Sequence, residues 1–136
     1  MINNIKKGVR TAEFVSPLHP DKICDFIADS LLDLYLASDP SSRVAIEVMG
    51  GHDLITINGE VTSSFSFDIP KEVLNILSRL NIKQENFKVI SNIKLQSSEI
   101  SRGVDLGGAG DQGIMLGYAT NETANFMPLE YELARE

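Results

Sequence analysis

A glycine-rich segment near the carboxyl end most constrains how this chain can fold. The apolar periodicity that precedes it stops between Gln96 and Gly113, where five glycines fall within eleven residues: Gly103, Gly107, Gly108, Gly110 and Gly113. Glycine weakens helices and strands because it loses the most conformational freedom in them, and it permits tight turns and close approach of a ligand. We therefore predict a long functional loop here, with regular structure on either side.

Helical spacing of apolar residues precedes and follows this loop. The first helix is predicted from Pro20 to about Ala37 and the second from Pro70 to about Asn81, because proline suits the first turn of a helix. A third helix is predicted from Pro128 to Glu136. On the first helix, a row of aspartates is predicted to be a solvated face rather than a metal site: Asp25, Asp29 and Asp33.

Three segments instead have the composition of strands, namely residues 43–49, 54–57 and 87–95. The first two are predicted to form an antiparallel hairpin with a four-residue connection, residues 50–53. Asn58-Gly59 is predicted to bend the chain or form a bulge before Glu60. This order of elements predicts an α+β fold, a two-layer sandwich in which a mainly antiparallel sheet is covered by helices on one face.

Length and charge limit the classes of partner. A chain of 136 residues with 43% hydrophobic residues suits a single domain with a real core. The net charge of −7, without clustered Lys and Arg, argues against nucleic acid and anionic membranes. No apolar run approaches the ~18 residues of a membrane span. The one cysteine, Cys24, is predicted to pack as a small apolar residue, and a reducing, cytoplasmic setting is expected.

The sequence His19-Pro20-Asp21 marks the entrance of the first helix. Backbone N–H groups and the helix dipole favour an anion there, so His19 could donate to a phosphate and Asp21 could hold magnesium. The alternative is structural, with Asp21 as the helix cap and His19 as a surface loop residue.

Two glutamates in the strand region have open alternatives. Glu47 shares a face with Ala45 and Met49, so it either binds a cation on a buried face or is solvated on an exposed one. Glu60 follows a glycine, where a ligand could approach closely or a bulge could present a surface acid.

The predicted loop is bracketed by Gln96 and Asp111, two side chains able to hold a polar small molecule. His52, beside Gly51, is predicted to be an exposed turn histidine. The sequence contains neither a metal-binding CxxC nor a Walker-type GxxxxGK[ST] motif. Nucleophilic catalysis is not supported.

Two strings of residues, in this order, indicate a family. The chain reads Ser16-Pro17-Leu18-His19-Pro20-Asp21-Lys22 early and Gly108-Ala109-Gly110-Asp111-Gln112-Gly113 late, with Asn58-Gly59-Glu60 and Gln96-Ser97 between them. From Glu13 to about Tyr131 it resembles the amino-terminal part of S-adenosylmethionine synthetase, also called methionine adenosyltransferase. This resemblance implies a domain at residues 1–136, with 108–136 leading into a central domain that is missing from the sequence.

The resemblance also implies an activity and a set of roles. Enzymes of this family join ATP and L-methionine with the help of Mg²⁺ and K⁺, and release phosphate and diphosphate. Carried over by residue, His19 would help expel the triphosphate, Asp21 would bind magnesium and Glu47 would bind potassium. The remaining three would contact substrate: Glu60, Gln96 and Asp111. The expected partners are a homo-oligomer or a complementary chain carrying the central and carboxy-terminal domains.

The chain departs from the family pattern at Pro17-Leu18, where the family has Glu-Gly, and in the loop after Gln96. Three readings follow from these departures and from the length. The chain is a segment or subunit active only with the missing domains, or a non-catalytic assembly subunit of a full-length synthetase, or an inactive fragment.

Overall fold

The computed structural model describes residues 8–83, 87–97 and 112–136. The chain divides into two compact units: Pro17–Gln112, and Met1–Ser16 together with Gly113–Glu136. The larger unit contains the predicted site residues that the structure describes: His19, Asp21, Glu47, Glu60 and Gln96. Asp111 lies outside the described residues. No described helix is long and apolar enough to cross a membrane.

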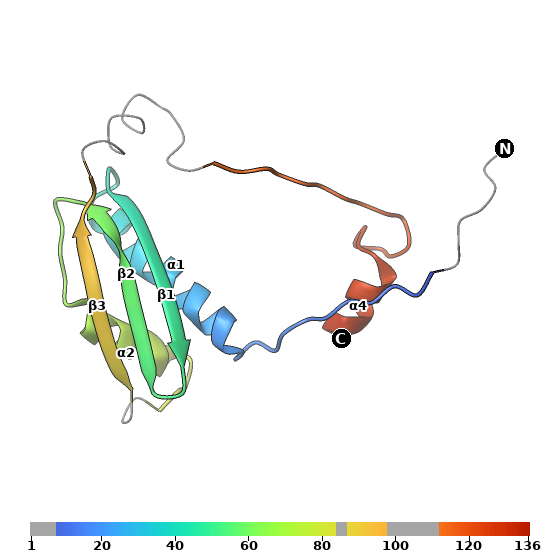
Figure 1. Ribbon diagram of the computed structural model, residues 1–136, viewed down its shortest axis with the longest axis horizontal. Coiled ribbons are helices and arrows are strands. Elements are labelled where there is room, and N and C mark those ends of the chain that lie inside the picture. Colours follow the sequence, from blue (N-terminus) through green and yellow to red (C-terminus); the bar gives the residue numbers. More distant parts are fainter. Residues whose placement is uncertain (1–7, 84–86, 98–111) are drawn as a thin grey trace. The chain divides into compact units, whose positions relative to one another are not determined.

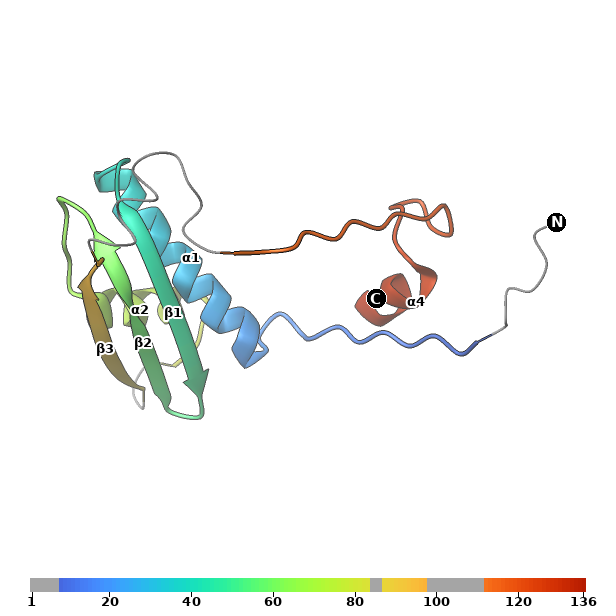
Figure 2. The same ribbon diagram turned by 45° about the horizontal axis from the view of Figure 1, so that its top comes forward.

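The larger unit is a sheet covered by helices on one face. Its elements follow one another as α1 (Pro20–Ser38), β1 (Arg43–Gly51), β2 (Leu54–Thr62), α2 (Ile69–Arg79) and β3 (Lys88–Leu95). Both helices lie on the same side of the three strands (Figures 1 and 2). Among the described residues of this unit, no helix or strand covers the other side, which we call the open face. The predicted α+β class with one helical layer is confirmed.

The sheet is mixed, with β2 in the centre. β1 pairs antiparallel with β2, from Arg43 opposite Thr62 to Gly51 opposite Leu54. β3 pairs parallel with β2, because α2 forms the crossover that returns the chain to the starting edge. The hairpin connection is tighter than the predicted four residues: strand pairing runs to Gly51 and resumes at Leu54, and His52 turns the chain with a φ of 51°.

The predicted bend at Asn58-Gly59 is wrong. β2 runs through both residues in unbroken register, with Gly59 opposite Ile46. Gly59 has a φ of 153°, and a Cβ atom built on it would overlap the carbonyl oxygen of Ala45. The glycine is therefore needed for close approach of two strands rather than for a turn.

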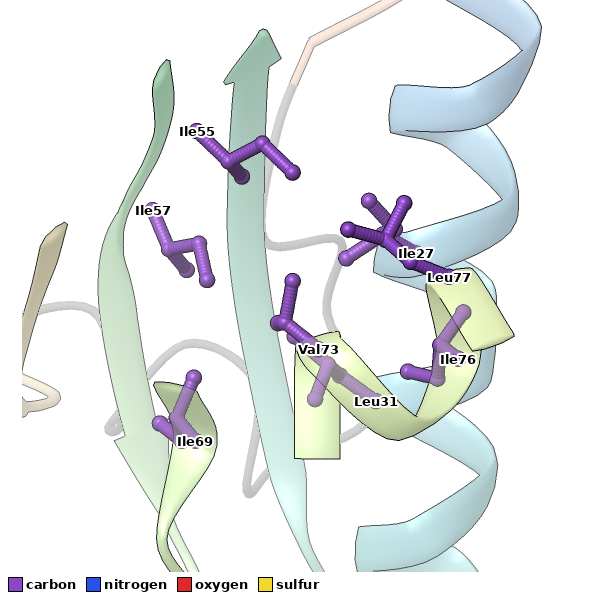
Figure 3. Close-up of a cluster of buried hydrophobic side chains, with 8 residues drawn as sticks. All are labelled: Ile27, Leu31, Ile55, Ile57, Ile69, Val73, Ile76 and Leu77. Carbon is purple, nitrogen blue, oxygen red and sulfur yellow. The ribbon is translucent and has the colours of Figure 1, made fainter. Parts of the chain in front are cut away.

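The core lies between the sheet and the two helices (Figure 3). Four of its residues come from the helices with no exposed surface: Ile27, Leu31, Val73 and Leu77. Ile57 of β2 is likewise fully buried, and Ile55 is 2% exposed. Burying a side chain of this size contributes about 2 kcal/mol, so this cluster fixes the sheet against the helices.

The far end of α1 is fixed by a carboxylate. Asp39, at the carboxyl end of α1, accepts hydrogen bonds from the backbone N–H and hydroxyl of Ser41 and from those of Ser64, just after β2. These donors hold the pKa of the Asp39 carboxyl well below its ordinary value, with the Ser41 hydroxyl as the largest cause. The end of α1 is thereby fixed beside the end of β2.

The smaller unit joins an amino-terminal segment to a carboxy-terminal helix, α4 (Leu129–Arg135). The Arg10 guanidinium donates to both carboxylate oxygens of Glu122 at 3.0 and 3.1 Å and lies 3.3 Å from Glu130. Glu122 also accepts the backbone N–H of Leu129 at the start of α4. The predicted third helix is thus present, held to a segment more than a hundred residues earlier in the chain.

Candidate functional site

Alternation along β1 places Glu47 on the open face of the sheet. Val44, Ile46 and Val48 are half-buried toward the helices, whereas Ala45, Glu47 and Met49 are exposed. Of the two alternatives for Glu47, the exposed face is the one observed. Any cation held by Glu47 would therefore approach from the side of the sheet that the helices leave open.

Strand register arranges the open face into rows across the sheet. Arg43 lies opposite Thr62, and Ala45 lies in a row with Glu60 and Lys94. The next row contains Glu47, Asn58 and Asn92, in which the Asn92 amide donates to Asn58 Oδ1 at 3.1 Å. Polar and charged side chains therefore occupy adjacent rows on this face.

Glu60 and Gln96 come together where β2 and β3 end. The backbone N–H of Ser97, next to Gln96, donates to Glu60 Oε2 at 3.3 Å. The guanidinium Nε of Arg43 donates to Gln96 Oε1 at 2.8 Å, in a partly buried position. Glu60, near the end of β2, and Gln96, directly after β3, are thus each held by a hydrogen bond at the same end of the sheet. Glu47 lies on the same face, in the row next to that of Glu60.

Arg43 lies with Glu60 and Gln96 at this end of the sheet, although the sequence alone did not identify it as a site residue. Strand alternation carried a signal, since Arg43 is two and four residues from Ala45 and Glu47 and therefore shares their face. Its contact with Gln96 crosses the central strand, which no local pattern reveals.

His19 and Asp21 occupy the start of α1. His19, rather than Asp21, is the helix cap: its Nδ1 accepts the backbone N–H of Asp21 at 3.2 Å. An accepting Nδ1 leaves the proton of the neutral ring on Nε2, which is then a donor. The Asp21 side chain is 83% exposed, and its Oδ2 lies 3.7 Å from His19 Nδ1. The structure therefore presents one N–H donor and one carboxylate together at a positive helix end.

The two groups of residues lie toward opposite ends of the unit. α1 begins beside Gly50 and Gly51, with which Pro20 and Cys24 line an apolar cavity of about 100 Å³. It ends at Asp39 beside Ser64, just beyond β2. From the level of Gly50 to that of Ala45 and Glu60 the strand extends roughly 17 Å. Within one chain, His19 and Asp21 are therefore not next to Glu60 and Gln96.

The structure also gives the positions of the aspartate row, His52 and Cys24. The aspartate row of α1 is exposed, and His52 is exposed in its turn. Cys24 is half-buried, and burial raises the pKa of its thiol, which disfavours the reactive thiolate. Among the described residues there is no group of three His, Cys, Asp or Glu side chains able to hold a metal ion. A divalent ion at Asp21 would need further ligands from a substrate or another chain.

The chain matches two family models and several curated relatives. Residues 7–100 match the family model "S-adenosylmethionine synthetase, N-terminal domain", and residues 106–136 match "S-adenosylmethionine synthetase, central domain". S-adenosylmethionine synthases of Mycoplasmopsis pulmonis and Fusobacterium nucleatum are both 46% identical, over 97% and 93% of this chain. These alignments cover 36% and 34% of the two relatives, so the chain spans about a third of their length.

A solved structure is similar as well. An unusual S-adenosylmethionine synthetase from Campylobacter jejuni superposes with a TM-score of 0.73 at 32% identity, over 88% of this chain and 33% of that one.

Proposed function

Because this chain belongs to the S-adenosylmethionine synthetase family, we propose that it forms the amino-terminal part of such an enzyme. In this proposal it makes S-adenosylmethionine from ATP and L-methionine, releasing phosphate and diphosphate, and it is active only with the remaining domains on another chain. Residues 1–136 act as one domain, with 108–136 leading into the central domain. The observation that carries the proposal is that Glu60 and Gln96 are each held by a hydrogen bond at the same end of the sheet, Glu60 by the N–H of Ser97 and Gln96 by Arg43. The same chain presents His19 and Asp21 at a helix start.

The transfer step makes one carbon–sulfur bond and breaks one carbon–oxygen bond, and water then cleaves the released triphosphate into phosphate and diphosphate. The sulfur of methionine donates its electron pair to C5′ of the ribose, and the C5′–O bond breaks so that the triphosphate leaves with that bond's electrons. Such a displacement depends on alignment of the substrates and on stabilising charge on the leaving group. Glu60 and Gln96 align the substrates by holding methionine. The His19 Nε2–H helps to stabilise charge on the leaving group by donating to the triphosphate. Asp111 contacts the bound substrate in this proposal.

The donor chemistry of two carboxylates suits the proposed cations. Asp21 offers a single exposed carboxylate, and magnesium is commonly bound by one or two carboxylates together with substrate phosphates. Glu47 offers an exposed carboxylate in the same row as Asn58 and Asn92. The carboxylate and the two amide oxygens are hard oxygen donors suited to K⁺. The cations would balance negative charge on ATP and the leaving triphosphate, while Asp21 and Glu47 fix where they bind.

The separation of the two groups of residues supports a site shared between chains. A ligand held at Glu60 and Gln96 is out of reach of His19 and Asp21 of the same chain by the length of about five strand residues. A homo-oligomer in which two copies face each other would bring the methionine-binding groups of one copy to the triphosphate-binding groups of the other.

The test is to combine this chain with a polypeptide carrying the remaining two thirds of the Mycoplasmopsis pulmonis relative, and to measure S-adenosylmethionine by mass spectrometry. Product that depends on ATP, methionine and Mg²⁺, and that is lost with His19→Ala, is expected. Unchanged product with His19→Ala would exclude the proposed role of His19.

A second candidate is a non-catalytic assembly subunit, which the substituted and exposed Pro17-Leu18 pair before His19 favours. In that case a full-length relative would bind this chain and keep its activity, and the combination with the missing domains would form no product.

A further inference from the structure

We propose that Arg43 is a positioning residue that orients the side-chain amide of Gln96, so that its amino group faces the carboxylate of the amino-acid substrate. This inference rests on the proposed function, which places methionine at Gln96. It adds to that function a specific basis for preferring an α-amino acid over an analogue without the carboxylate.

The contact that carries the inference crosses the sheet. Arg43 is the first residue of β1 and lies opposite Thr62 at the end of β2. Gln96 follows directly after β3, whose Leu95 lies opposite Val61. Since β2 stands between β1 and β3, the Arg43 side chain passes over the end of the central strand to donate from Nε to Gln96 Oε1 at 2.8 Å.

The chemistry of this contact decides which end of the amide is presented. A guanidinium group has only N–H donors, so it can be satisfied by the amide oxygen of Gln96 but not by the amide nitrogen. Oε1 therefore faces Arg43, and the Nε2 amino group is left to donate to a ligand. Without Arg43 the amide could rotate by half a turn and present its oxygen, which would repel a carboxylate.

A second contact fixes the neighbouring acid. Glu60 Oε2 accepts the backbone N–H of Ser97, the residue after Gln96. The site thus offers a fixed N–H donor beside a fixed carboxylate acceptor. This pair is complementary to the carboxylate and ammonium groups of an amino acid, each of which forms charge-assisted hydrogen bonds.

The experiment compares Arg43→Gln with Lys88→Gln in the combined enzyme described above. Lys88→Gln removes the same charge from an exposed position at the opposite end of the sheet and serves as the control. Arg43→Gln should raise the KM for methionine roughly tenfold, because a hydrogen bond to a charged group is involved. Its kcat and its KM for ATP should stay within about twofold of wild type, as should all constants of the control.

The inhibition constant of L-methioninol separates positioning from general damage. This analogue has a CH₂OH group in place of the carboxylate, so it gains little from a correctly oriented Gln96 donor. Arg43→Gln should weaken methionine much more than methioninol, and Arg43→Lys should fall between wild type and Arg43→Gln. Equal weakening of both ligands, or a lowered kcat with unchanged KM, would overturn the proposal.

A measurement on this chain alone keeps the inference independent of catalysis. In ¹⁵N-labelled protein, the Arg43 Nε–H resonance should be protected from exchange with water, and Gln96→Ala should abolish that protection while Lys88→Gln leaves it unchanged. Absence of protection in the wild-type chain, or no response to Gln96→Ala, would overturn the role of Arg43 whatever the activity. Protection without any product from the combined enzyme would instead count against the proposed function.

Discussion

The Nδ1 atom of His19 accepts a hydrogen bond from the backbone N–H of Asp21, at 3.2 Å. This one contact caps α1, fixes the imidazole ring and leaves Nε2 as the protonated nitrogen. It therefore connects the stability of the helix to the proposed handling of the triphosphate, and the two roles are separable by substitution.

His19→Asn should keep the cap and remove the donor. Asparagine is a good capping residue, so the free energy of unfolding should change by less than about 0.5 kcal/mol, whereas His19→Ala should lose about 1 kcal/mol. Both variants should abolish most product formation in the combined enzyme, because neither has the Nε2–H. Denaturant unfolding and product assays on the same samples test this. If activity followed stability, with His19→Asn active and His19→Ala inactive, the histidine would be only a cap.

Gly59→Ala should destabilise the sheet strongly. The new Cβ would overlap the Ala45 carbonyl oxygen at a φ of 153°, and the expected loss is about 3 kcal/mol from backbone strain and overpacking. Gly51→Ala is the matched control, since a Cβ there meets nothing within 4 Å, and it should change stability by less than about 0.5 kcal/mol. Similar unfolding midpoints for the two variants would contradict the close approach of β1 and β2.

Asp39→Asn should destabilise the larger unit at neutral pH, and its effect should disappear in acid. The hydrogen bonds from Ser41 and Ser64 lower the pKa of Asp39 in the folded state. A lowered pKa gives stability that is fully present above the unfolded-state pKa of about 4 and is lost as the pH falls toward the folded value. Thermal unfolding from pH 7 downward should show the two melting temperatures converging below about pH 4. Asp29→Asn, on the exposed face of α1, should show no such convergence.

Substitutions on the two faces of the sheet should differ in cost. Ile57 is fully buried against the helices, so Ile57→Ala should cost about 2–5 kcal/mol and Ile57→Val about 1 kcal/mol. Met49 is 71% exposed on the open face, and Met49→Ala should cost less than about 0.5 kcal/mol in the isolated chain. Chemical denaturation measures all three. A large cost at Met49 would show that the open face is already covered in this chain.

The elements of the fold were largely predictable because their signals are local. Pro20 and Pro70 mark the starts of two helices, and alternation of Val44, Ile46 and Val48 marks a strand with one buried face. The parallel pairing of β3 depends on how α2 packs, which alternation does not encode. Asn58-Gly59 was misleading because glycine serves both turns and close strand approach, and only the opposing Ala45 carbonyl distinguishes them.

For the candidate site, the sequence indicated a set of residues that stays a prediction, and it did not indicate their arrangement. Resemblance to the family pointed to His19, Asp21, Glu47, Glu60 and Gln96, and the structure places the last three on the open face of one sheet. His19 is separated from Glu60 because α1 begins beside Gly50 and Gly51, whereas Glu60 lies opposite Ala45. The contact of Arg43 with Gln96 joins two strand ends that are far apart in sequence, so no local sequence motif predicts it.

Complementation between two inactive variants tests the central claim most directly. Combined enzymes carrying His19→Asn or Glu60→Gln should each form almost no S-adenosylmethionine. If the site takes His19 from one copy and Glu60 from another, dissociating and mixing the two variants should create some sites free of both substitutions. About a quarter of wild-type activity is then expected from random pairing in a dimer. A mixture as inactive as its components would contradict a site shared between copies of this chain.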